Sequence, residues 1–241
     1  MRFSFFPLII FLFSISLFAQ NPEYSVSKSP DSLKLNANAV VRLEQIDIFI
    51  SSEISFYVKK KRIVTVFNDE GFIKINAFEH YDKRTSVVSI KAIVLDSSGN
   101  EIKKFKRKDF IDQSINRSER LSSDGRSIDL ICTTPFKYPC TVIYESELET
   151  NSNLVAHIPQ WIPFLKCMVS IEKSFLNVSY PKNIGFKKME FNFPNAKISK
   201  TLESSTKLSY IATNMPAVKC ENFYQNSSET FPRVLILLKY F

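Results

Sequence analysis

Glycine, histidine and tryptophan are scarce in this 241-residue chain, which contains four, two and one of them respectively. Its only neutral-pH bases are therefore His80 and His157, and neither stands in a His-Glu-x-x-His or Gly-x-Ser-x-Gly motif. The two histidines are 77 positions apart, and no acidic loop with calcium-binding spacing occurs. We expect no metal site, no cofactor and no imidazole-based catalysis.

Cysteine is also sparse, and the cysteines are too widely spread for a disulfide scaffold. They stand at Cys132, Cys140, Cys167 and Cys220. A hairpin could bring the α-carbons of Cys132 and Cys140 within the roughly 7 Å that a disulfide requires; otherwise all four are small buried hydrophobic residues. Each lies in or beside apolar sequence, where burial raises the pKa of a thiol. A cysteine nucleophile is not expected, and we predict that the chain is not an enzyme.

The N-terminus has the pattern of a secretory signal. Met1 and Arg2 precede an apolar run from Phe3 to Phe18, and small Ala19 follows. This run is shorter than the ~20 residues that a membrane-spanning helix needs. Residues 1–19 are therefore predicted to be a cleaved signal peptide, with export to the periplasm or beyond and no stable membrane span after cleavage.

Long apolar runs at helical spacing are missing from the rest of the chain, whereas β-branched and aromatic residues are abundant. Nine strands are predicted: Val40–Ile50, Ile54–Phe67, Ser86–Leu95, Glu101–Lys106, Ile128–Thr134, Cys140–Leu148, Val169–Val178, Phe186–Phe193 and Lys207–Thr213. Parallel crossovers would need helices, so the fold class expected is all-β, as an antiparallel β-sandwich.

Domain boundaries follow from composition. Residues 20–38 are polar, and their apolar residues follow neither the helical nor the strand period. This predicts a linker before a β-sandwich module over 39–241. The segment 154–166 contains two prolines, so the module is either one sandwich or two packed β subdomains that divide there. Gly99 lies in the turn of a predicted hairpin that spans Ser86 to Lys106.

The net charge of +8 is concentrated in basic runs, one of which is Lys59, Lys60, Lys61 and Arg62. Such a run is a solvated strand face, a contact for an anionic surface or polymer, or a nucleic-acid contact. An exported chain does not meet nucleic acid as a rule, and no glycine-rich or aromatic binding repeat accompanies the run. We therefore expect no nucleic-acid partner.

Trp161 lies between two prolines, Pro159 and Pro163. With nearby tyrosines it could form a platform on which a sugar stacks, or it could fill the core at a corner of the fold. Trp161 and the basic run Lys59–Arg62 are the candidate contacts for a ligand or partner.

Several phrases together resemble a bacterial domain of unknown function that precedes a transglutaminase-like, papain-fold domain in secreted proteins. The phrases are Lys106–Ser114, Leu121–Arg126, Tyr138–Glu145, Trp161–Pro163, Ser170–Ser174 and Asn214–Ala217. The resemblance covers roughly 35–241 and implies a β-sandwich module of a cell-envelope protein. The catalytic residues of such proteins would belong to the following domain, which is absent here, so none is carried over.

The chain ends on an apolar run, Pro232–Phe241, which would be prone to aggregate as an unpaired edge. This ending and the resemblance favour a non-catalytic N-terminal accessory module from a truncated or split chain, whose partner is a downstream transglutaminase-like domain. The alternative is a stand-alone cell-envelope protein that binds a peptide or a glycan polymer through a sheet edge or its basic face.

Overall fold

A computed structural model describes residues 21–75, 77–115, 124–131, 136–152, 158–163, 167–193, 197–219 and 231–238. The predicted signal peptide, 1–19, and His157 lie outside these ranges. The fold is mostly β, with 58% strand and 9% helix, which confirms the predicted class. Within the described ranges, no helix has both the length and the apolar character needed to span a membrane.

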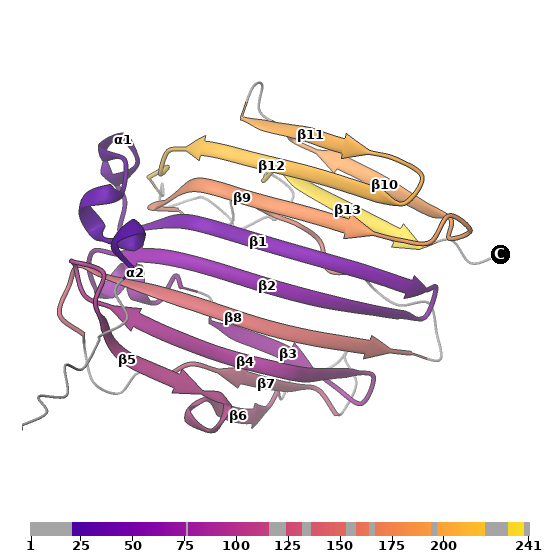
Figure 1. The fold of residues 1–241 in the computed structure, drawn as a ribbon, viewed down its shortest axis with the longest axis horizontal. Coiled ribbons are helices and arrows are strands. Elements are labelled where there is room, and N and C mark those ends of the chain that lie inside the picture. Colours follow the sequence, from indigo (N-terminus) through magenta and orange to yellow (C-terminus); the bar gives the residue numbers. More distant parts are fainter. Residues whose placement is uncertain are drawn as a thin grey trace, which may run out of the picture.

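An eight-stranded sheet forms one layer (Figure 1). Its strands are, in spatial order, β11 (Ile198–Glu203), β12 (Lys207–Met215), β9 (Val169–Ser179), β1 (Ala39–Ser52), β2 (Ser55–Val66), β8 (Cys140–Asn151), β4 (Thr85–Leu95) and β5 (Glu101–Lys106). All neighbours are antiparallel except β1 and β9, which are parallel, so the sheet is mixed rather than purely antiparallel.

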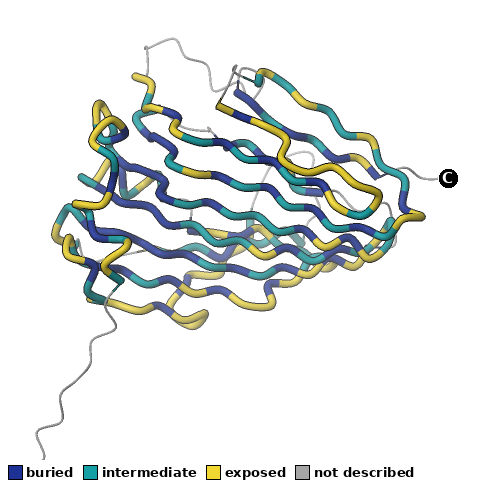
Figure 2. The backbone as a smooth tube through the Cα atoms, turned by 45° about the horizontal axis from the view of Figure 1, so that its top comes forward, coloured by how far each residue is buried: buried dark blue, intermediate teal, exposed yellow. Residues whose placement is uncertain are grey.

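Alternation along the strands decides which side chains face the core, and Figure 2 shows it as alternating bands of burial. On β8, Val142, Tyr144 and Leu148 are buried beneath the sheet. Glu145 and Glu147 point to the other face, because successive side chains of a strand point in opposite directions. The predicted hairpin is also present: β4 and β5 pair, and Gly99 in their turn has φ +92°.

Two small sheets form the second layer behind the large one (Figure 1). One contains β3 (Phe78–Tyr81), β7 (Arg126–Asp129) and β6 (Ile111–Ser114); the other pairs β10 (Phe186–Phe191) with β13 (Arg233–Leu238). One continuous hydrophobic cluster fills the space between the layers. Strands from before and after 154–166 share the large sheet, which joins the two halves of the chain.

The C-terminal run differs from its expected state as an unpaired edge. β13 pairs with β10 on one side, and on the other side Val234 and Trp161 exchange backbone hydrogen bonds of 2.9 and 3.0 Å. Val234, Ile236 and Leu238 are buried beneath the large sheet. The run is apolar because every second side chain belongs to the core.

The predicted linker over 20–38 is wrong for its described part, which is folded against the sheet. It forms η1 (Pro22–Tyr24), η2 (Val26–Lys28) and α1 (Asp31–Lys34). The backbone N–H of Asn21 donates to the carbonyl of Gly99 at 2.9 Å, and that of Val26 donates to Ser97 at 3.0 Å. The polar composition concealed this packing.

The outer face of the large sheet explains why this segment is ordered. Ile63, Leu95 and Ile143 form a small apolar cluster there, and Tyr24 packs against it. Arg42, which lies at an irregularity in the pairing of β1 with β2, donates from Nη1 to the carbonyl of Ser25 at 3.2 Å. The segment therefore covers apolar surface that the second layer cannot reach.

Neither interpretation of the cysteines holds in full. Cys167 is disulfide-bonded, so the cysteines are not all reduced hydrophobic residues. Cys140 keeps a buried thiol at the start of β8, so the hairpin disulfide between Cys132 and Cys140 is not formed. Cys132 and Cys220 lie outside the described residues.

Candidate functional site: a charged cavity between the layers

The basic run Lys59–Arg62 does not form one patch, because it lies on a strand. Lys59 and Lys61 point to the outer face of the large sheet, where their side chains are 52% and 42% exposed. Lys60 and Arg62 point inward, between the layers, and are 27% and 17% exposed. The run therefore contributes two charges to each face.

On the outer face the lysines take part in a ladder of ion pairs across β2, β8 and β4. Lys59 lies 3.4 Å from Glu147, while Lys61 and Lys91 lie 3.3 and 2.7 Å from Glu145. Partial burial raises the pKa of Glu145, but hydrogen bonds and charge from Lys91 and Lys61 outweigh it and lower the pKa overall. This face is a polar surface with its charges largely balanced.

On the inner face, Arg62 pairs with Glu44 of β1, which is its direct neighbour in the sheet. Ser174 of β9 donates its hydroxyl to the other oxygen of Glu44 at 2.7 Å. The indole Nε1 of Trp161 in turn donates to the Ser174 oxygen at 2.9 Å. Four side chains from three strands and one loop form a single chain of contacts.

Lys60 forms a second inner pair, with Glu79 of β3, at 2.6 Å. Glu79 is only 4% exposed, and it also accepts hydrogen bonds from Ser146 at 2.7 Å and from Tyr144 at 3.2 Å. Burial and the negative charge of Glu79 raise the pKa of the Tyr144 phenol. The phenol is therefore held as a hydrogen-bond donor. This pair links the large sheet to the small β3–β7–β6 sheet.

A cavity of about 410 Å³ lies at these two pairs. Its charged lining consists of Glu44, Lys60, Arg62 and Glu79, with Lys61 and His80 also at its boundary. The apolar lining comes from β1, β2, β3, β8, β9 and the segment 158–163: Ile46, Phe56, Val58, Phe78, Leu148, Pro159, Ile162, Pro163, Val169 and Ile171. A volume of this size with few converging polar groups is typical of ligand pockets, which span roughly 300–1,000 Å³.

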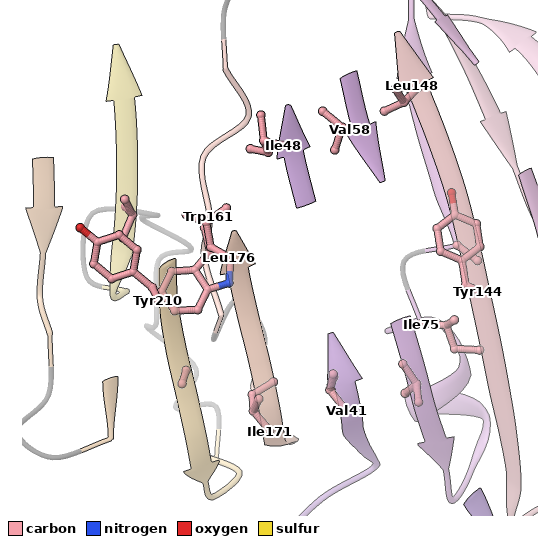
Figure 3. Close-up of a cluster of buried hydrophobic side chains, with 14 of the residues drawn as sticks. Val41, Ile48, Val58, Ile75, Tyr144, Leu148, Trp161, Ile171, Leu176 and Tyr210 are labelled. Atoms are coloured by element: carbon pink, nitrogen blue, oxygen red, sulfur yellow. The ribbon is translucent and has the colours of Figure 1, made fainter. Parts of the chain in front are cut away.

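Trp161 is a core residue, with no exposed surface. Its ring lies 6.0 Å from that of Tyr210, between centroids, and Figure 3 places both near Leu176, away from Tyr144. A fully buried indole has no face on which a sugar could stack. Its connection to the cavity is indirect, through Ser174 and Glu44.

Another basic run, Lys103–Lys106, lies on β5, whose outer edge is not paired within the described sheet. Lys103, Lys104 and Lys106 are exposed, and Lys103 Nζ lies 4.9 Å from the centre of the Phe105 ring. Lysines on an edge strand hinder pairing with another chain. The position of β5 at the edge of the sheet therefore explains why this strand contains several exposed lysines.

His80 is an exposed residue of β3, with its ring centre 5.0 Å from that of Phe78. Across the described parts of the chain, no group of three or more His, Cys, Asp or Glu side chains is placed to hold a metal ion.

Sequence reasoning missed Glu44, Glu79 and Ser174, which complete the inner network. One signal could have found Glu44. It is in phase with the partly buried Ile46 and the buried Ile48 along β1, so the alternation that points those side chains inward also points this carboxylate inward. A charged residue at a core position of a strand predicts a buried partner.

No protein-family model and no curated protein matches the chain. Among solved structures, the chain resembles a putative protease from Parabacteroides distasonis, with a TM-score of 0.62, 13% identity and 83% of this chain covered. The matched region is 40% of that protein, so this chain spans less than half of its length. At this identity the similarity shows a shared fold.

A second match is to an M1 zinc metallopeptidase from Deinococcus radiodurans. It covers 83% of this chain and 42% of that one, with 7% identity and a TM-score of 0.34. This TM-score is too low for an argument about fold.

Proposed function

We propose that the chain is a non-catalytic accessory module of an exported protein whose catalytic part is a transglutaminase-like domain. One observation carries the proposal: a match over 83% of this chain accounts for 40% of a putative protease. The same fold thus occurs there as one part of a longer chain. A remainder of that size leaves room for a separate domain, since domains are typically about 50–250 residues long.

The phrases that resemble the domain preceding transglutaminase-like domains support the choice of partner. Tyr138–Glu145 contains Tyr144, and Ser170–Ser174 contains Ser174. Tyr144 donates to Glu79 and Ser174 donates to Glu44, while Trp161 donates to the Ser174 oxygen. Three of the phrases therefore contribute to the hydrogen bonding around the two inner carboxylates.

Export is supported by two independent features. The first nineteen residues have the pattern of a secretory signal, and Cys167 is disulfide-bonded. Disulfides persist in oxidising compartments such as the periplasm and are rare in the cytosol.

The test compares three samples: the purified chain, the product of the coding region that follows it, and the two together. Peptide hydrolysis and acyl transfer are measured for each. We expect no turnover by the chain alone, and a raised melting temperature or altered kcat/KM of the partner when the chain is added. Turnover by the chain alone, abolished by His80→Ala or Cys140→Ala, would contradict the proposal.

A stand-alone envelope binding protein is the second candidate, and the cavity between the layers favours it. This candidate requires the chain to bind a ligand without a partner domain. If the chain binds its ligand by itself and leaves the partner's stability and kcat/KM unchanged, the binding role is favoured over the accessory role.

A further inference from the structure

Both oxygens of each inner carboxylate accept hydrogen bonds from neighbouring side chains. Glu44 accepts from Arg62 and Ser174. Glu79 accepts from Lys60 through one oxygen and from Ser146 and Tyr144 through the other. The acids at the cavity are therefore neutralised and hydrogen-bonded.

The two inner cations are not saturated. Arg62 donates to Glu44 through Nη1, and among the described residues its Nη2 has no hydrogen-bond partner. Its Nε also has no partner there, but this atom is buried and does not face the cavity. To the described residues, Lys60 donates one hydrogen bond, which Glu79 accepts, although an ammonium has three N–H groups. A buried donor without a partner costs roughly 1–3 kcal/mol. The cavity thus has a surplus of donors beside apolar walls.

We propose that this cavity binds a carboxylate attached to an apolar group, with the carboxylate at Arg62 and Lys60 and the apolar part against Phe56, Leu148 and Ile162. A carboxylate supplies the acceptors that the cations lack, and hydrogen bonds between ionised groups are about twice as strong as neutral ones. The chemistry fits the C-terminus of an apolar peptide or a fatty acid. The proposal does not depend on the accessory role, because it concerns the chain alone.

Buried ion pairs are a weak explanation on stability grounds. Replacing such pairs with well-packed apolar residues is often neutral or stabilising, by about 1–4 kcal/mol. Two pairs placed around a cavity, rather than packed within a solid core, are accounted for by a ligand that completes their hydrogen bonding.

The experiment uses the fluorescence of Trp161, the chain's single tryptophan, which is linked to Arg62 through Ser174 and Glu44. The purified chain is titrated with N-acetylphenylalanine and its amide, and with octanoate and octanamide. We expect at least one acid to bind about tenfold or more tightly than its amide, a difference of about 1.4 kcal/mol. The acid that binds identifies the source, peptide or fatty acid.

Arg62→Lys keeps the positive charge beside Glu44 but removes Nε and the planar donor set. It should weaken binding of the acid about tenfold and leave the amide unchanged. Lys59→Met, on the outer face of the same strand, is the matched control and should bind the acid as the wild type does.

Three outcomes overturn the proposal. The wild-type chain binds neither acid, it binds acid and amide equally, or Lys59→Met weakens binding as much as Arg62→Lys does. The wild-type comparison needs no substitution, so the proposal stays falsifiable if Arg62→Lys does not fold.

Discussion

The basic run Lys59–Arg62 lies in two different environments, one on each face of the large sheet. Lys59 and Lys61 meet carboxylates in water, across an exposed ladder. Lys60 and Arg62 meet carboxylates that the second layer and the sheet shield, at a cavity. The comparison teaches that a basic run on a strand is not a surface patch, because alternation assigns each neighbour to a different environment.

The largest effect is expected from Glu79→Ala on the inner face. Removing this carboxylate leaves Lys60, Ser146 and Tyr144 without their acceptor. The free energy of unfolding, measured with urea, should fall by about 3–5 kcal/mol. Glu147→Ala on the outer face is the control and should cost about 1 kcal/mol or less. Equal losses would show that the two faces do not differ energetically.

A smaller effect is expected from Ser174→Ala, which removes a neutral link of the inner network. It leaves the indole N–H of Trp161 and one oxygen of Glu44 without partners, at a cost of about 1–3 kcal/mol. Ser89→Ala, the same change at an exposed position of β4, should stay within about 0.5 kcal/mol. A comparable loss at Ser89 would indicate that hydroxyl burial does not decide the effect.

On the outer face, Lys91→Met removes one of the two lysines that contact Glu145. The expected loss is about 0.2–1 kcal/mol at low salt, and it should shrink at high salt because exposed charges are screened. Urea unfolding at two salt concentrations measures it. A loss that is independent of salt would mean that packing of the lysine stem, and not its charge, is responsible.

The smallest effect concerns the exposed Glu203 on β11. Hydrogen bonds from Lys188 and Lys200 lower its pKa from 4.5 to about 2. Because the folded pKa is depressed, its stabilisation is present above pH 4.5 and is lost as the pH falls from 4.5 to about 2. Glu203→Gln should therefore lose less stability than the wild type across that window, as judged from urea midpoints. Identical pH profiles would rule out this contribution.

Most strands could be predicted because alternation is a local property. Eight of the nine predicted strands are present within three residues of their expected bounds, whereas β7 shares only Ile128 and Asp129 with the predicted strand Ile128–Thr134, part of which lies outside the described residues. The strands outside that prediction, β3, β6, β11 and β13, have only four to six residues, and all four residues of β6 are exposed. The parallel pairing of β1 with β9 joins Ala39 to Val169, a contact that no local pattern reports.

Only the cations of the candidate site could be predicted, because a local pattern does not report contacts between distant strands. The basic run that supplies its cations, Lys60 and Arg62, was identified as a candidate contact. The partners come from elsewhere: Glu79 is 19 positions from Lys60, and Ser174 is 130 positions from Glu44. Composition also misled over 20–38, since polar residues there pack on apolar surface of the sheet that becomes visible only after the strands assemble.

The sequence by itself determined the all-β class, the strand positions and the alternation that separates Lys59 from Lys60, because these depend on neighbours along one strand. Only the tertiary structure decided that Trp161 is buried, that residues 21–38 cover the outer face, and that four charges meet at one cavity. These depend on which distant strands become neighbours, and burial of apolar surface over the whole chain selects that arrangement.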